Sequence, residues 1–132
     1  MGVNLAVVFI TPLLCAVCEA MYHEHMGVLS LDQLRTVAQR TAPNHGVGEM
    51  YVYGSVSRGE NGPHSDVDLI YRLDDNHRAT AGAILSLKDD LEAGLGSPVS
   101  LLSQKTLLFN AEHTVSGRRF YDAIKHDLTR IV

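Results

Sequence analysis

Apolar residues recur every three or four positions in three stretches of the chain, and this spacing predicts three amphipathic helices. The first helix starts at the capping-box pair Ser30 and Gln33. The second is predicted over 79–95 and ends at Gly96, and the last is predicted over about 114–131. The expected buried faces are, in chain order, Leu31, Leu34, Val37 and Ala38; Ile84, Leu87, Leu91 and Leu95; and Phe120, Ile124, Leu128 and Ile131.

Three short stretches rich in Val, Tyr and Leu predict strands over 49–53, 66–73 and 98–102, and Ser103 is expected to cap a short helix after the third. In the second strand the side chains should alternate between two faces, with Val67, Leu69 and Tyr71 on one and Asp68, Ile70 and Arg72 on the other. The order of elements predicts an α/β fold, a small mixed sheet flanked by helices. The first two strands are expected to be antiparallel neighbours.

Length and charge narrow the classes of protein that fit this pattern. The chain has 132 residues, which corresponds to one domain with a real core. Its formal net charge is −4, so broad electrostatic attraction to nucleic acid is not expected. This balance argues against a polymerase or a DNA-binding protein, although a nucleotide whose charge is offset by a metal ion is compatible with it.

The segment 3–18 is apolar, nearly uncharged and interrupted by Pro12. It is shorter than the about 20 residues that a membrane span needs, and it lacks the basic start of a signal peptide. It is an over-extended start, a helix packed on the domain, or a weak export signal. We favour the first of these. The predicted organisation is an extension over 1–26 followed by a domain over 27–132. The protein is expected to be cytoplasmic and not to contact a membrane.

Two small clusters in the same region have both a chemical and a structural interpretation. Cys15 and Cys18 have the C-x-x-C spacing of a redox pair, but too little chain precedes them for a thioredoxin-type fold, so we favour two small apolar residues. The run His23-Glu24-His25 is either a metal clip or a polar connector, and we favour the connector.

The most informative pattern joins a tight turn to two carboxylates. Gly54-Ser55 ends the first strand, and Asp66 and Asp68 begin the second. Such a turn can present backbone N–H groups and a hydroxyl to phosphate oxygens. Carboxylates at i and i+2 of a strand point to the same face, with Cα atoms roughly 6.6 Å apart, so they can hold one hard cation or two adjacent ones. The pattern predicts a metal–nucleotide site.

Ten residues separate Ser55 from Asp66, which gives the pattern G-S-x10-D-x-D. This pattern resembles the signature of the DNA polymerase β-like nucleotidyltransferase superfamily. It is most similar to the minimal nucleotidyltransferases, which are encoded beside HEPN-domain partners in prokaryotic toxin–antitoxin modules. The segments Arg58-Gly59-Glu60 and 65–69 also fit that group, and the similarity runs over about 29–121. Neither the Gly-Ser pair nor Asp-x-Asp is specific alone.

The resemblance implies a function and a role for each residue of the motif. Asp66 and Asp68 would bind Mg²⁺ and be the catalytic residues, while Gly54 and Ser55 would hold the β- and γ-phosphates of ATP. Ser65 and Arg58 belong to the implied nucleotide site, where Arg58 either contacts phosphate or braces the loop. The protein would transfer AMP to a hydroxyl, a tyrosine being the expected acceptor, on a HEPN ribonuclease toxin and act as its antitoxin.

The sequence departs from the family pattern at the third acidic residue. Active members carry it on the strand after the second helix, where this chain has Ser100, and serine is a poor base near neutral pH. Asp74 or Asp75 could replace it only if they reached across from the far end of their strand. Two alternatives therefore stay open: an antitoxin that neutralises its partner by binding alone, and a nucleotidyltransferase acting on a small molecule such as an aminoglycoside.

Overall fold

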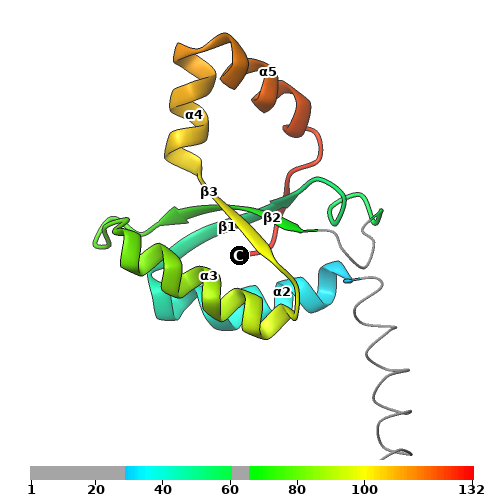
Figure 1. The fold of residues 1–132 in the computed structure, drawn as a ribbon, viewed down its shortest axis with the longest axis vertical. Helices are drawn as coiled ribbons and strands as arrows, with labels where there is room; N and C mark the ends of the chain where they lie inside the picture. Colours follow the sequence, from blue (N-terminus) through cyan, green and yellow to red (C-terminus); the bar gives the residue numbers. More distant parts are fainter. Residues whose placement is uncertain (1–28, 61–65) are drawn as a thin grey trace, which may run out of the picture.

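The computed structural model describes residues 29–60 and 66–132, which form a four-stranded mixed sheet with helices on both faces (Figure 1). The strand order is β3-β2-β1-β4, and β1 is antiparallel to both of its neighbours, while β2 and β3 are parallel. The strands are β1 (Val47–Tyr53), β2 (Val67–Leu73), β3 (Val99–Ser103) and β4 (Thr129–Arg130). The predicted fold class and the antiparallel pairing of the first two strands are confirmed.

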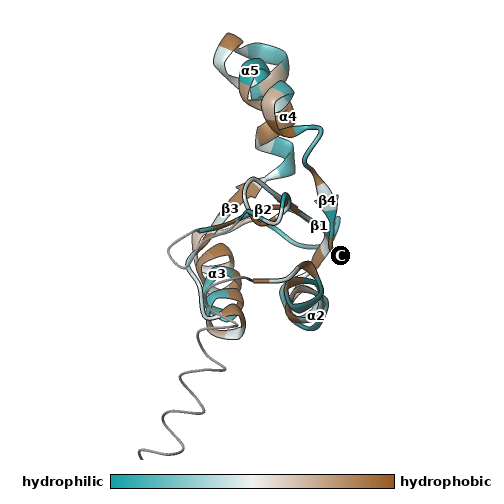
Figure 2. Cartoon of the chain, turned by 90° about the vertical axis from the view of Figure 1, so that its right-hand side faces the viewer, coloured by the Kyte–Doolittle hydropathy of each residue, from teal (hydrophilic) through white to brown (hydrophobic). Residues whose placement is uncertain are grey.

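The helices form two separate layers (Figure 2). Helices α2 and α3 lie side by side under one face of the sheet, and α4 and α5 form a hairpin that extends from the other face. Helices α4 and α5 contact each other far more than they contact the sheet. The helices are α2 (Leu31–Thr41), the 3₁₀ turn η1 (Ala42–His45), α3 (Ala81–Leu95), α4 (Gln104–His113) and α5 (Val115–Ile124).

The predicted helix ends have clear local causes in the structure. Ser30 accepts a hydrogen bond from the Gln33 N–H while the Gln33 side chain accepts one from the Ser30 N–H, which is the expected capping box. Helix α3 starts two residues later than predicted because the Thr80 side chain caps it, and Gly96 ends it in a left-handed conformation. Ser103 is the N-cap residue of the short helix α4, as expected, although its side chain makes no capping hydrogen bond.

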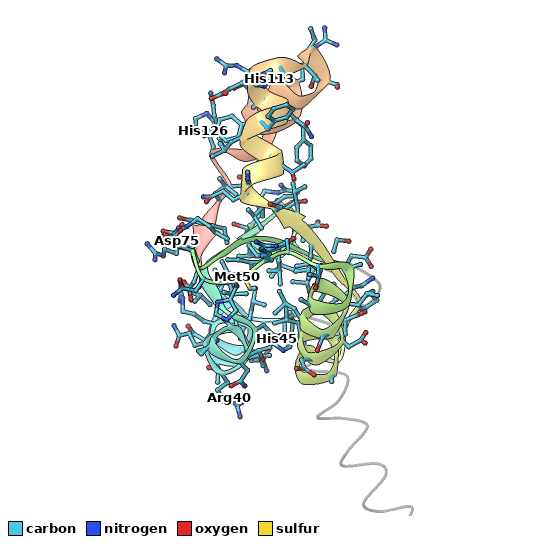
Figure 3. The ribbon with its side chains drawn as sticks, turned by 90° about the vertical axis from the view of Figure 1, so that its left-hand side faces the viewer. Arg40, His45, Met50, Asp75, His113 and His126 are labelled. Atoms are coloured by element: carbon cyan, nitrogen blue, oxygen red, sulfur yellow. The ribbon has the colours of Figure 1, made fainter. Side chains whose placement is uncertain are left out.

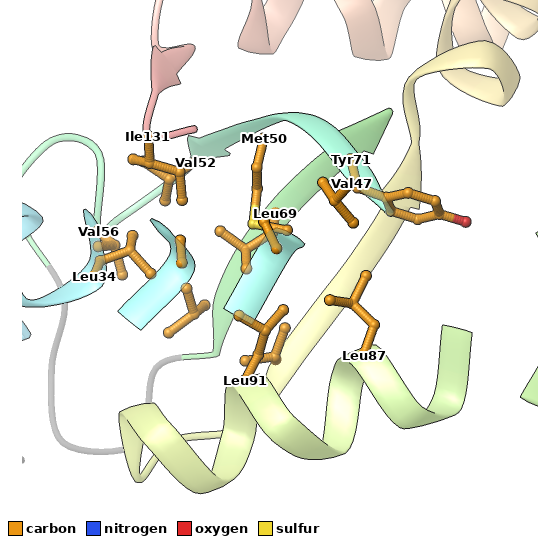
Figure 4. Close-up of a cluster of buried hydrophobic side chains, with 14 of the residues drawn as sticks. Leu34, Val47, Met50, Val52, Val56, Leu69, Tyr71, Leu87, Leu91 and Ile131 are labelled. Atoms are coloured by element: carbon orange, nitrogen blue, oxygen red, sulfur yellow. The ribbon is translucent and has the colours of Figure 1, made fainter. Parts of the chain in front are cut away.

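The main core lies between the sheet and helices α2 and α3 (Figure 4). Val67, Leu69 and Tyr71 of β2 belong to it, whereas Ile70 packs on the opposite face with Leu107. This is the predicted alternation of β2. The alternation also turns Asp68 away from the main core and toward the α4–α5 side.

The prediction of one long C-terminal helix was wrong. Helix α5 ends at Ile124, and Thr129–Arg130 instead forms a strand at the edge of β1. The Ile131 N–H donates to the Met50 carbonyl oxygen at 2.9 Å, and Ile131 is only 2% exposed in the main core. The apolar spacing fits a helix, but the open backbone groups of β1 and the core pocket for Ile131 stabilise a strand.

The predictions for the N-terminal region concern residues outside the described ranges. They are the boundary at residue 26, the cysteine pair and the His-Glu-His cluster. Within the described chain, no helix is long and apolar enough to cross a membrane.

The burial of Ile131 yields a stability prediction. Ile131→Ala should lower the free energy of unfolding by about 2–4 kcal/mol, because it removes a buried side chain and leaves a cavity. Urea unfolding measures the change. Leu85→Ala is the matched control: Leu85 is 59% exposed, so its loss should stay within about 0.5 kcal/mol. Equal losses for the two variants would contradict the burial of the C-terminal strand.

Candidate functional site

The pairing of β1 with β2 brings the glycine turn and the second aspartate together. Tyr53 and Asp68 are register partners, and Gly54 follows Tyr53 with a φ of +77°. A Cβ atom placed on Gly54 would lie 3.0 Å from Oδ2 of Asp68. The carboxylate therefore lies close to the glycine, and a side chain at residue 54 would crowd it.

The turn after Gly54 is compact and anchored in the core. The Arg58 N–H donates to the Gly54 carbonyl at 3.2 Å, and the Glu60 N–H donates to the Ser55 carbonyl at 2.8 Å. Val56 is 2% exposed and fixes the turn to the main core. The Ser55 hydroxyl makes no hydrogen bond within the described chain, so it is available to a ligand.

Arg58 braces the turn against the C-terminal segment. Its Nε lies 3.0 Å from Oε2 of Glu60, and its Nη1 lies 2.9 Å from Oδ2 of Asp127. Ser57 adds to this link, since its hydroxyl donates to the Asp127 carbonyl and lies 3.0 Å from Oγ1 of Thr129. The sequence left two roles open for Arg58, contact with phosphate and bracing of the loop. In the structure Arg58 makes the bracing contacts.

Asp66 and Asp68 form an acidic pair without a cationic partner in the described chain. Asp66 is exposed and Asp68 is half-buried. Burial raises the pKa of the Asp68 carboxyl above its ordinary 3.8, and the negative charge of Asp66 raises that pKa further. The fold therefore holds two carboxylates close enough to repel each other, which is an arrangement that a cation would relieve.

Ser100 occupies the position expected for the missing acid. It is the register partner of Asp68 in the parallel β2–β3 pair, and it is exposed. Asp74 and Asp75 do not replace it, because they lie at the other end of β2, where the Asp74 N–H donates to the Gly46 carbonyl.

Histidines do not complete the pair either. His45 and His113 lie on opposite sides of the sheet (Figure 3). Across residues 29–60 and 66–132, no group of three His, Cys, Asp or Glu side chains is placed to hold a metal ion. Ser65 lies outside the described residues, so its predicted role stays a prediction.

A hollow of about 520 Å³ lies beside the acidic pair, between the sheet and the α4–α5 hairpin. We call it the hairpin pocket, and its lining includes Tyr53, Ser100, Leu102, Asn110, Ser116 and Phe120. The rings of Tyr53 and Phe120 meet edge to face, with centroids 6.0 Å apart. Burial raises the pKa of the Tyr53 phenol, and so does the charge of Asp68, which keeps the phenol protonated. Sequence reasoning missed this pocket, because it assigned Phe120 to a buried face although it is 42% exposed.

A model of one protein family, described as nucleotidyltransferase domain, matches residues 31–126. The chain belongs to the nucleotidyltransferase domain family. A protein of Methanocaldococcus jannaschii with the provisional name of protein adenylyltransferase is 33% identical over 61 residues, which is 46% of this chain and 61% of that protein. The nucleotidyltransferase domain described here thus aligns with less than two thirds of that relative.

Two solved structures share the fold of this nucleotidyltransferase domain. One carries the provisional description of minimal nucleotidyltransferase, and its sequence is 31% identical to this chain. The two structures match with a TM-score of 0.50 over 59% of this chain and 81% of the other. The second is described as a toxin–antitoxin with AMP-PNP; it is 16% identical, has a TM-score of 0.52, and the match covers 79% of this chain and 73% of the other. At that identity the second structure supports the fold alone.

The residues present fit the magnesium ion that the family implies. Mg²⁺ prefers oxygen ligands, and Asp66, just before β2, and Asp68, on β2, supply two carboxylates without a cationic partner in the described chain. The Ser100 hydroxyl adds a neutral oxygen at the neighbouring register position.

The contact between Gly54 and Asp68 yields a paired prediction. Gly54→Ala and Gly59→Ala should each lose about 1–2 kcal/mol of stability, because both glycines have positive φ. Only Gly54→Ala places a methyl group against Asp68, since nothing lies within 4 Å of a Cβ on Gly59. Calorimetry should therefore detect weaker magnesium-dependent ATP binding for Gly54→Ala alone. Equal affinities for the two folded variants would contradict this geometry.

The raised pKa of Asp68 yields a pH prediction. Folding raises the pKa of Asp68, so the ionised carboxylate lowers the stability of the native state. This loss of stability is absent below the ordinary pKa, where the carboxyl is neutral, and is complete above the raised pKa. Asp68→Asn should therefore be more stable than wild type at pH 7 without metal. Solvent screening at this half-buried carboxyl keeps the gain below about 1 kcal/mol.

Urea unfolding between pH 7 and pH 4 measures the difference, which should shrink as pH falls toward the ordinary 3.8. Asp66→Asn is the comparison, and it should gain less because Asp66 is exposed. A less stable Asp68→Asn protein at pH 7 would show that Asp68 has a stabilising partner instead.

Proposed function

We propose that this nucleotidyltransferase domain binds ATP with magnesium and transfers AMP to a hydroxyl of a partner protein. The observation that supports it is the position of the Asp68 carboxylate against Gly54, next to the available Ser55 hydroxyl. A phosphate-binding turn and a cation-binding carboxylate are thereby held at one point of the sheet.

Each group of the chain has a defined task in this proposal. The Ser55 hydroxyl and the backbone N–H groups of the turn donate hydrogen bonds to the β- and γ-phosphate oxygens. Asp66 and Asp68 hold Mg²⁺, which when bound offsets the charge of the triphosphate. The Arg58 brace keeps the turn in place while the phosphates bind.

The transfer step is a displacement at the α-phosphorus. The acceptor oxygen forms a bond to that phosphorus, the bond from the phosphorus to the bridging oxygen breaks, and pyrophosphate leaves with its electron pair. The acceptor also loses a proton. Ser100, the register partner of Asp68, is an alcohol and a poor base near neutral pH, so in this proposal the proton passes to solvent water.

The partner in this proposal is a HEPN ribonuclease toxin, and the modification silences it. One relative carries the provisional name of protein adenylyltransferase, which supports a protein acceptor. A structure that shares the fold is described as a toxin–antitoxin with AMP-PNP, and this description motivates the proposed antitoxin role. A tyrosine hydroxyl is the acceptor that we propose.

A second function has its own supporting observation. Ser100 stands opposite Asp68, where active members of the family carry an acid, and the described residues supply no replacement. Losing a general base typically lowers a rate by about 10²–10⁴-fold. The second proposal is therefore an antitoxin that binds the nucleotide and its partner without turnover.

One experiment separates the two functions. The wild type, Asp66→Ala and Ser100→Asp are each incubated with α-labelled ATP, Mg²⁺ and the HEPN toxin, and the label on the toxin is measured. Transfer predicts a labelled toxin with the wild type, at least about 100-fold less label with Asp66→Ala, and more with Ser100→Asp. Label that appears only with Ser100→Asp, while the wild type still binds magnesium–ATP, would support the function without turnover and contradict the first.

A further inference from the structure

The hairpin pocket is lined by two neighbours of Asp68. Tyr53 and Ser100 are the two register partners of Asp68, one on each neighbouring strand, and both line the pocket. A molecule with its phosphates at the turn therefore has this hollow beside its α-phosphate. The volume of about 520 Å³ is within the range of small-molecule sites.

We propose that the hairpin pocket takes the nucleoside part of the nucleotide, and that Phe120 and Asn110 make it selective for adenine. This inference rests on the proposed nucleotide function and adds base recognition to it. All residues that form the pocket come from β1, β3 and the α4–α5 hairpin.

Phe120 provides a surface on which a base can stack. It remains 42% exposed although it lies at an apolar wall formed with Leu102 and Leu107. Tyr53 contacts it edge to face at an interplanar angle of 86°, which restrains the ring. Stacking on such a ring favours any base, so it provides affinity but no selectivity.

Asn110 provides the selectivity. Its backbone carbonyl accepts hydrogen bonds from the N–H and the hydroxyl of Thr114, both at 2.9 Å, while its side-chain amide has no hydrogen bond within the described chain. The amide offers one donor group and one acceptor side by side. The N6 and N7 edge of adenine is complementary to this pair, whereas guanine presents two acceptors at the matching edge.

Gly117 holds the two sides of the pocket together. A Cβ on Gly117 would lie 2.3 Å from the Asn110 carbonyl oxygen, so only glycine lets the first turn of α5 approach the end of α4 so closely. Thr114 caps α5 at the same point by accepting a hydrogen bond from the Gly117 N–H at 2.9 Å. This junction places Asn110 and Phe120 around one hollow.

The test compares ligands with and without a base. Calorimetry in Mg²⁺ measures binding of ATP, GTP and tripolyphosphate to the wild type, Phe120→Ala, Asn110→Ala and Phe109→Ala. Phe109 is the matched control, because it is an exposed phenylalanine of the same hairpin that stacks on His113 and does not line the pocket.

The wild type should bind ATP more tightly than GTP and tripolyphosphate. Phe120→Ala should weaken ATP binding by roughly 5- to 100-fold and leave tripolyphosphate binding within twofold, which also shows that the variant is folded. Asn110→Ala should reduce the preference for ATP over GTP. Phe109→Ala should behave as the wild type.

Other outcomes would overturn the inference in distinguishable ways. Equal wild-type affinities for ATP and tripolyphosphate would leave the phosphate site intact and refute the base pocket. Unchanged ATP affinity in Phe120→Ala, with less label transferred to the partner, would assign the pocket to the acceptor side chain instead. A wild type that binds none of the three ligands would refute the proposed function itself, and the base pocket with it.

Discussion

The antiparallel pairing of β1 with β2 is the constraint on which the rest of the structure depends. Side chains alternate along β2, so burying Val67, Leu69 and Tyr71 against helices α2 and α3 forces Asp68 onto the opposite face. A slip of one residue in the register would send the carboxylate into the core and the leucine out of it. The packing of β2 against helices α2 and α3 therefore determines which face of the sheet the Asp68 carboxylate occupies.

The same constraint places two like charges next to each other. The fold holds Asp66 and Asp68 together without a counter-charge in the described chain, and the raised pKa of Asp68 reflects this arrangement. Natural proteins commonly lose stability where a site is organised for a ligand. Here the unfavourable interaction between two carboxylates is one that a bound cation would relieve.

Much of the fold could be predicted because its signals are local. The alternation in β2, the capping box at Ser30 and the glycine end of α3 each depend on neighbouring residues. The C-terminal strand could not be predicted, because Leu128 and Ile131 continue a helical spacing and their actual position depends on the open edge of β1.

The candidate site shows the same division. The meeting of Gly54 with Asp68 follows from motif spacing and a hairpin-like return, and both are present in the sequence. The brace from Arg58 to Asp127 and the hollow beside Phe120 join segments that are distant in the chain, so only the tertiary arrangement reveals them.

The attachment of the α4–α5 hairpin has an evolutionary consequence. The hairpin leaves the sheet at the end of β3 and returns just before β4, and its few buried anchors are Ile70, Leu107 and Ile124. The main core on the other face contains none of the hairpin residues. Mutations or insertions within 104–124 can thus accumulate without disturbing the packing of the main core that positions Gly54 and the acidic pair.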